Sequence, residues 1–126
     1  MRTVLDTSVL IHGVSPHLRG DLAISTVSLA ELHFGVLVAR SDEDRAHRLR
    51  RLSEVIQAFT PLPVDEPVSR SYGALAATVA RSGGSPRARA LDLLFAATAH
   101  AHGARLATYN AANLQHLSHL VDVVAL

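Results

Sequence analysis

The start of the chain alternates apolar and polar positions in blocks that are typical of a strand followed by a helix. An apolar run at residues 3–5 leads into Asp6, and a second apolar run at 9–11 follows Thr7 and Ser8. We predict a short buried strand that ends at Asp6 and a helix that is capped by Thr7 or Ser8. Ligands bind at the carboxyl ends of the strands in an open α/β sheet, so Asp6 is a candidate site residue.

The rest of the chain repeats this alternation of strand and helix patterns. The pattern predicts a strand at 21–25, helices at 26–40 and 41–59, an edge strand or connector at 60–64, helices at 66–82 and 88–102, a strand at 105–108, a short helix at 111–120 and a strand at 121–124. Strands that alternate with helices indicate an α/β fold with right-handed crossovers and a mostly parallel sheet of about four to five strands. No internal repeat and no long linker divides the chain, so we expect a single domain over residues 1–126.

Two of the predicted helices have a distinct apolar side. In the segment 26–40, helical spacing predicts a buried face that consists of Leu29, Leu32, Val36 and Leu37. In the segment 41–59, the residues expected on the inner side are Leu49, Leu52, Val55, Ile56 and Phe59. The outer side of that second helix carries Arg45, His47, Arg48, Arg50 and Arg51. A solvated cationic face is the plainer interpretation of this charge run, and a surface that faces phosphates or a partner is the alternative.

Composition narrows the class of protein. The chain has 126 residues, of which 48% are hydrophobic, and this is ample for a core. Its net charge is only +1, so nucleic-acid binding would need local basic patches rather than a field from the whole chain. The absence of cysteine excludes disulfides and thiolate metal sites. The N-terminus has no signal-peptide pattern and no apolar run is long enough to cross a bilayer, so we expect a cytoplasmic protein.

Three carboxylates have no simple surface role. Asp6 ends the first predicted strand, Glu31 lies one turn into the helix after the second strand, and Asp92 lies within the apolar stretch 90–94. Strand ends and the helix starts that follow them share one edge of a parallel sheet, so these acids can converge there. Carboxylates that meet at neutral pH require a cation, and hard oxygen ligands favour Mg²⁺, with Mn²⁺ as a substitute. Glu31 also stands at capping-box spacing from Ser28, which is an equally good structural explanation of that residue.

Four segments carry a resemblance to a known family. They are 4–8 (VLDTS), 25–32 (STVSLAEL), 92–99 (DLLFAATA) and 106–110 (LATYN). In this order and at these intervals they resemble the motifs of PIN-domain ribonucleases and, more narrowly, of VapC toxins from VapBC toxin–antitoxin modules. The resemblance implies a Rossmann-like three-layer fold and a Mg²⁺-dependent endoribonuclease that cleaves structured cellular RNA, often tRNA or rRNA. It also implies a homodimer that a VapB-type antitoxin silences.

The resemblance assigns roles to single positions. Asp6, Glu31 and Asp92 match the first three acidic residues of the family, whereas the fourth position holds Asn110 or Asn113 in place of the usual aspartate. Asparagine offers a carbonyl oxygen but no charge, and this puts a second tightly held metal in doubt. The interval from the first acid to the second also looks short for the family.

The mechanism that follows from this assignment uses one metal ion. Asp6 and Asp92 are expected to anchor Mg²⁺ directly or through water, and Glu31 is expected to orient or deprotonate the attacking water. The remaining candidates for catalysis or substrate binding are Asn110, Asn113, Thr108, Ser8, Arg87 and Arg89. The two arginines flank a Gly-rich break at 82–86 and are placed to contact RNA phosphates, although ordinary surface arginines would look the same.

Other chemistries have less support in the sequence. An aspartate-based phosphatase needs a second aspartate where this chain has Ser8, and it needs a lysine, of which the chain has none. Two histidine pairs at 100/102 and 116/119 lack a third nearby ligand, so we expect them on helix surfaces rather than at a transition metal. A PIN-like module that has lost its fourth acid and binds RNA or a protein without cleavage remains the main alternative.

Overall fold

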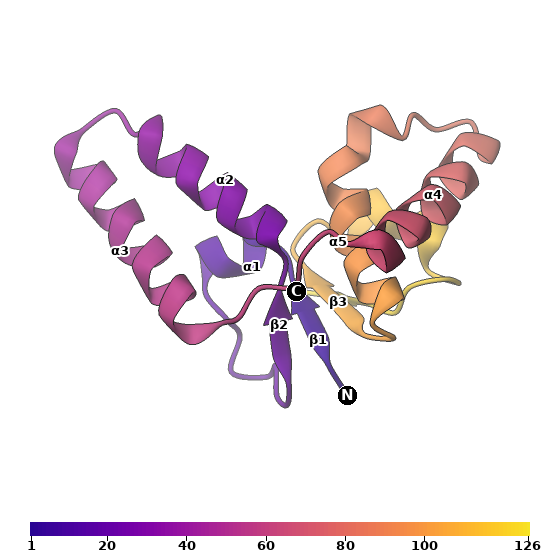
Figure 1. The fold of residues 1–126 in the computed structure, drawn as a ribbon, viewed down its shortest axis with the longest axis horizontal. Helices are drawn as coiled ribbons and strands as arrows, with labels where there is room; N and C mark the ends of the chain where they lie inside the picture. Colours follow the sequence, from indigo (N-terminus) through magenta and orange to yellow (C-terminus); the bar gives the residue numbers. More distant parts are fainter.

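The computed structural model describes all residues 1–126 and is organised around a four-stranded sheet (Figure 1). The strands are β1 (Thr3–Leu5), β2 (Leu22–Ile24), β3 (Arg105–Thr108) and β4 (Val123–Ala125). Their order across the sheet is β2-β1-β3-β4, and all neighbouring pairs are parallel. The prediction of an α/β fold with a parallel sheet is therefore confirmed. The segment that was expected as an edge strand or connector contributes one isolated bridge, between Leu62 and Ser25.

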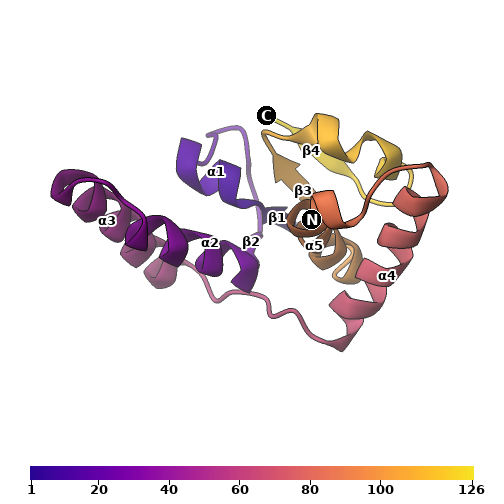
Figure 2. The ribbon, with the colours of Figure 1, turned by 90° about the horizontal axis from the view of Figure 1, so that it is seen from above.

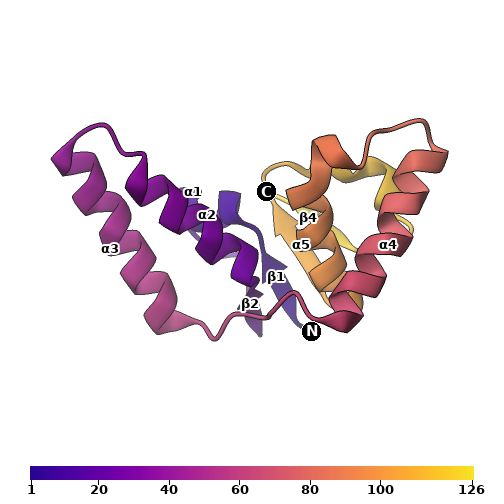
Figure 3. The ribbon, with the colours of Figure 1, turned by 45° about the horizontal axis from the view of Figure 1, so that its top comes forward.

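Helices cover both faces of this sheet. The α-helices are α1 (Thr7–His12), α2 (Thr26–Leu37), α3 (Asp42–Ala58), α4 (Glu66–Arg81) and α5 (Ala90–Ala101). Two 3₁₀-helices, η1 (Arg87–Arg89) and η2 (Ala111–Leu117), precede α5 and follow β3. Figures 2 and 3 show α1, α2 and α3 on one side of the strands, with α4 and α5 on the other. None of the helices is both long and apolar enough to cross a bilayer.

The alternation of side chains along the strands separates two apolar cores. Val4 and Leu106 face the core that α4, α5 and η2 complete. Leu5 and Ala107, the next residue on each strand, face the core that α1, α2 and α3 complete. The central strands are short and apolar, and both of their faces are buried. This is expected, because parallel sheets are covered on both sides. The result is the three-layer arrangement that the sequence predicted.

The α2–α3 pair extends away from the sheet as a wing, opposite the α4–α5 pair (Figures 1 and 3). The predicted buried face of this wing is partly wrong. Leu52 and Val55 are buried, but Leu37, Leu49 and Ile56 are 79%, 53% and 51% exposed. The reason is that α3 packs mainly against α2, so only a narrow apolar stripe of α3 needs to be buried. A helix that packs between two layers would need a wider apolar face.

The predicted caps of the first two helices are also wrong by one or more residues. The N-cap of α1 is Asp6, whose Oδ1 accepts a hydrogen bond from the backbone N–H of Val9. The N-cap of α2 is Ser25, whose Oγ accepts from the backbone N–H of Val27. In both places the chain turns into the helix directly at the end of the strand, so the last extended residue does the capping. Ser28 lies inside α2, and the capping box that it would form with Glu31 does not exist.

Smaller differences concern the helix ends. The predicted helix at 88–102 is divided into η1 and α5, and the predicted helix at 111–120 is a 3₁₀-helix that ends at Leu117. The last strand begins two residues later than predicted. Residues 87–89 have the tighter 3₁₀ winding, which is frequent at the N-terminus of an α-helix. Asp92 consequently lies in the first turn of α5.

Candidate active site

The sheet order places one aspartate at the point where the chain reverses its direction of winding. From β1 the chain proceeds to β2 on one side and later to β3 on the other, so the gap between β1 and β3 is the topological switch point. Asp6 follows β1 directly, and Thr108 is the last residue of β3. The backbone N–H of Asp6 donates to the carbonyl of Ala107 across this gap, at 3.2 Å. Crevices at such points are where open α/β sheets bind ligands.

Asp6 is held rigidly by neutral donors. Its side chain is 4% exposed. Ser8 Oγ donates to Oδ1 at 2.5 Å, and Thr108 Oγ1 donates to Oδ2 at 2.5 Å. Both hydroxyls also accept backbone hydrogen bonds, from the N–H groups of Tyr109 and Asn110. No arginine or histidine forms an ion pair with Asp6. The predicted substrate contacts Ser8 and Thr108 therefore lie against Asp6 and orient its carboxylate.

Glu31 is tied to the same helix start from the opposite side. Thr7 Oγ1 donates to Glu31 Oε1 at 2.6 Å and lies 3.1 Å from Ser28 Oγ. Thr7 is buried, whereas Glu31 is partly exposed. Thr7 thus links the start of α1 to α2 instead of capping α1. Sequence reasoning did not single out Thr7, although Ser28 and Glu31 lie three residues apart on one helix face and so can share a partner.

Asp92 completes the group from the first turn of α5. Burial raises the pKa of its carboxyl, and the nearby charge of Asp6 raises it further. Two contacts oppose this rise in the pKa of Asp92: the amide of Asn113, which donates to Oδ2 at 3.4 Å, and the positive charge of Arg89. Arg89 also donates to the backbone carbonyl of Asn113, at 2.9 Å. Asn113 therefore contacts the third acid, and η1 and η2 are joined beside it.

One pocket collects most of the candidate residues. It has a volume of about 220 Å³, and its polar lining consists of Asp6, Thr7, Ser8, Glu31, Asp92 and Asn110. A second pocket of about 360 Å³ shares Glu31 and Asp92 and is lined on its other side by Arg87 and Arg89. Of the two candidates for the fourth position, Asn110 lines the acidic pocket and Asn113 binds one of its carboxylates.

The donor set fits a hard divalent ion that keeps most of its water. No three acidic or histidine side chains of the chain surround a common point at metal-binding range. Asp6 and Asp92, however, line the same pocket and interact electrostatically, with no cationic ion-pair partner for either. Mg²⁺ is commonly bound through one or two carboxylates and several waters, so a pair of carboxylates is a sufficient direct ligand set. Glu31, held by Thr7, lines the same pocket.

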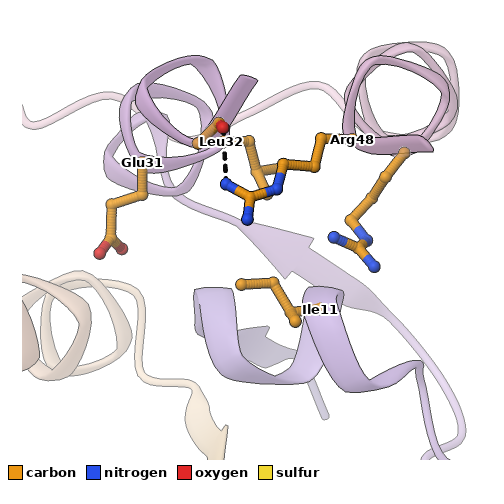
Figure 4. Close-up of a pocket in the computed structure, with 6 residues that line it drawn as sticks. Ile11, Glu31, Leu32 and Arg48 are labelled. Carbon is orange, nitrogen blue, oxygen red and sulfur yellow. Dashed lines mark hydrogen bonds between the residues drawn. The ribbon is translucent and has the colours of Figure 1, made fainter. Parts of the chain in front are cut away.

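The two histidine pairs lie away from the acidic pocket. All four histidines of the two pairs are exposed, as predicted, and His100 Nδ1 lies 2.8 Å from Ser71 Oγ in the contact between α4 and α5. A further pocket of about 200 Å³ lies between α1, α2 and α3 and adjoins the acidic pocket at Glu31 (Figure 4). In Figure 4, Arg48 extends from α3 toward α2, whereas Glu31 points away from it. This pocket was not predicted.

Comparison with known proteins agrees with this geometry. Residues 3–119 match the profile of the PIN domain. The chain belongs to the PIN-domain family. Within this family it is 40% identical over 102 residues to Ribonuclease VapC5 of Mycobacterium tuberculosis. The aligned region covers 76% of this chain and 73% of that protein. It is 34% identical over 113 residues to Ribonuclease VapC4 of the same organism, which covers 85% of each chain. These relatives place this PIN-domain chain among the VapC proteins, as its motifs indicated.

The fold of this PIN domain also matches solved structures over nearly its full length. The crystal structure of VapBC-5, a member of the VapBC family of toxin–antitoxin systems from Mycobacterium tuberculosis, superimposes with a TM-score of 0.87 at 34% identity. That match covers 99% of this chain and 98% of the other. FitAcB from Neisseria gonorrhoeae superimposes with a TM-score of 0.78 at 26% identity and covers 96% of this chain and 95% of the other.

Proposed function

We propose that this VapC-family PIN domain is a Mg²⁺-dependent endoribonuclease that uses Asp6, Glu31 and Asp92 to activate water. The observation that carries the proposal is that one pocket, at the topological switch point, is lined by all three acids. The two relatives of at least 30% identity are named ribonucleases, and this supports the reaction class. Mn²⁺ is the expected substitute for Mg²⁺, because it also accepts oxygen ligands.

The chain's own residues would divide the work as follows. Asp6 and Asp92 hold the ion, which when bound polarises water and offsets the charge of the phosphodiester. Glu31 accepts a proton from the attacking water or orients that water, and Thr7 keeps its carboxylate in place. Ser8 and Thr108 fix the carboxylate of Asp6 by donating to it. The hydroxyls of Ser8 and Thr108 would therefore act on the substrate only indirectly, by holding Asp6.

The proposed substrate is a structured cellular RNA in the cytoplasm, such as tRNA or rRNA. Arg87 and Arg89 line a pocket that shares Glu31 and Asp92, so a phosphate beside the cleaved bond would lie within their reach. Asn110 and Asn113 would meet the metal's water or the substrate through their carboxamides. Because neither asparagine brings a negative charge, one metal ion is the mechanism we propose.

The proposed partners are a VapB-type antitoxin and a second copy of the chain. Support for the first is that the matching VapBC-5 structure is described as a member of a toxin–antitoxin family. The homodimer is proposed from the family resemblance. An antitoxin that silences the enzyme would be recognised by growth arrest on expression of this chain alone and recovery on co-expression.

A cleavage assay tests the reaction. The purified chain should cut tRNA in Mg²⁺ and stop cutting in EDTA, and Asp92→Asn should abolish cleavage while leaving the fold intact. Asp122→Asn is the matched control, since Asp122 is exposed and only its backbone carbonyl bonds to β3. Cleavage by Asp92→Asn at the wild-type rate would reject the assignment.

The non-cleaving module is the second candidate, and the asparagines at the fourth position favour it. In that case RNA binding would persist in EDTA and in Mg²⁺ alike, without products. The same assay therefore separates the two functions.

A further inference from the structure

The pocket between α1, α2 and α3 is not explained by the chemistry of the acidic site. It is lined by Ile11, Glu31, Leu32, Gly35, Arg48 and Arg51 (Figure 4). Ile11 and Glu31 also line the acidic pocket, so the two pockets adjoin each other. Two arginines therefore lie next to the proposed reaction centre, on the side opposite Arg87 and Arg89.

The two arginines of this pocket differ in what they already bind. Arg48 forms an ion pair with Asp44 at 3.0 Å and donates to the carbonyl of Gly35 at 2.7 Å, so it ties α3 to α2. Arg51 has no ion pair, although Glu54 lies one turn away. Its one hydrogen bond joins Nη2 to His47 Nε2, at 3.3 Å. Arg51 is half-buried and lines this pocket, and its remaining guanidinium donors form no hydrogen bond within the chain.

Arg51 also lies on a longer basic path. It lines a second pocket, of about 270 Å³, whose charged and histidine lining otherwise consists of His12, His47, Arg50 and Glu54. On the far side of the acidic pocket, Arg87 and Arg89 continue the path. The acids thus lie between two groups of cations that come from α3 and from η1. This arrangement fits a chain of regularly spaced anions that meets cations on either side of the acids.

We propose that Arg51 binds a phosphate of the RNA strand on the α3 side of the cleaved bond. The inference rests on the proposed function, because it takes RNA as the substrate. A guanidinium matches phosphate with paired hydrogen bonds, and a single half-buried one with free donors is suited to this. An acidic protein segment fits less well, because it lacks the regularly spaced charges that would reach the cations of both α3 and η1.

Binding in EDTA tests the contact without cleavage. The probe is a fluorescein-labelled single-stranded RNA twelve nucleotides long, titrated with the full chain at several salt concentrations. Arg51→Gln should weaken binding by about tenfold, as expected for a hydrogen bond to a charged group. It should also lower the slope of log K against log salt by about 0.7, which is the contribution of one phosphate contact to a single strand. Arg51→Lys should keep that slope because it keeps the charge.

The matched control is Arg81→Gln, which removes the same charge from an exposed position at the end of α4, outside every pocket named above. It should leave the affinity and the slope unchanged. Arg51→Met, which retains the apolar stem, replaces Arg51→Gln if thermal melting shows that the glutamine variant is unfolded. In Mg²⁺, loss of Arg51 should raise KM and leave kcat unchanged, because the contact is present before and during the reaction.

The outcomes separate the two proposals. If the wild type binds and cleaves RNA and Arg51→Gln behaves like Arg81→Gln, the assignment of Arg51 is wrong and the nuclease stands. If the wild type shows no salt-dependent RNA binding, the proposed substrate fails and the inference fails with it. If Arg51→Gln weakens binding of a twelve-residue oligoglutamate but not of RNA, the pocket belongs to a protein partner and the inference is overturned.

Discussion

Thr108→Val is the most direct test of how Asp6 is held. Valine keeps the shape and the branched Cβ of threonine and suits the end of a strand, but it removes the hydroxyl that donates to Asp6 Oδ2 at 2.5 Å. Asp6 is 4% exposed, so water cannot fully replace the lost donor. A hydrogen bond to a charged group contributes about 1.5–3 kcal/mol, and the free energy of unfolding should fall by about this amount. The backbone N–H of Asn110 loses its acceptor as well, so the upper part of this range is expected.

The magnitude can be measured and assigned to the pair. For a chain of this size, about 1 kcal/mol corresponds to roughly 3–5 °C in Tm, so Thr108→Val should melt roughly 5–15 °C below the wild type. Thr108→Ser keeps the hydroxyl and should lose far less. Urea unfolding of both variants in wild-type and Asp6→Asn backgrounds completes a double-mutant cycle. The penalty should shrink in the Asp6→Asn background, because the charge that strengthens the bond is absent.

Two results would refute this reasoning. One is a Thr108→Val variant whose stability lies within about 0.5 kcal/mol of the wild type, the size of an ordinary surface substitution. The other is an equal penalty with and without the charge on Asp6. Either would mean that the hydroxyl is not a significant partner of the buried carboxylate.

The remaining predictions concern charge, metal and packing. Because the pKa of Asp92 is raised in the folded state, protonated Asp92 supports the fold below the ordinary carboxyl pKa, and that support is lost as the pH rises through the raised value. Asp92→Asn should therefore melt above the wild type at neutral pH in EDTA, with the difference vanishing at acid pH; a constant difference across the range would contradict this. Adding Mg²⁺ at 100 times its dissociation constant should stabilise the wild type by about 2.7 kcal/mol in urea unfolding and should stabilise Asp92→Asn much less, and equal shifts would exclude Asp92 as a ligand. Thr7→Val should slow RNA cleavage through Glu31 while Thr7→Ser does not, with kcat as the readout. Leu52→Ala should cost about 2–5 kcal/mol in unfolding free energy, whereas Leu49→Ala should change it by less than about 0.5 kcal/mol, because Leu49 is 53% exposed.

The predicted effects on charge and metal binding depend on a few contacts in the acidic pocket. Asp6 and Asp92 lie in one pocket and neither forms an ion pair, so each change of charge there has an electrostatic consequence. The hydroxyls of Ser8 and Thr108 neutralise no charge, but they fix the direction of the carboxylate lone pairs. A preorganised acid of this kind needs no rearrangement when an ion binds.

The order of elements and the parallel sheet were determined by the sequence alone. The apolar strand at residues 3–5, buried on both faces, and the regular return of helical spacing allow few other arrangements. Asp6, Glu31 and Asp92 could be selected because their positions at strand ends and helix starts share one edge of such a sheet. Local signals, which act over a few residues, are sufficient for these features.

Only the tertiary structure decided which partners these side chains have. Thr7 can cap a helix, and it is the approach of α2 that assigns it to Glu31 instead. Thr108 meets Asp6 only because β1 and β3 are neighbours in the sheet. Likewise, Leu49 has the same spacing and hydropathy as its buried neighbours, and it is exposed because nothing packs on the outer side of α3. The difference between Arg48 and Arg51 also depends on contacts with segments distant in the sequence. A sequence specifies such choices only through the packing of distant segments, because hydrogen bonding and burial depend on what each side chain meets in space.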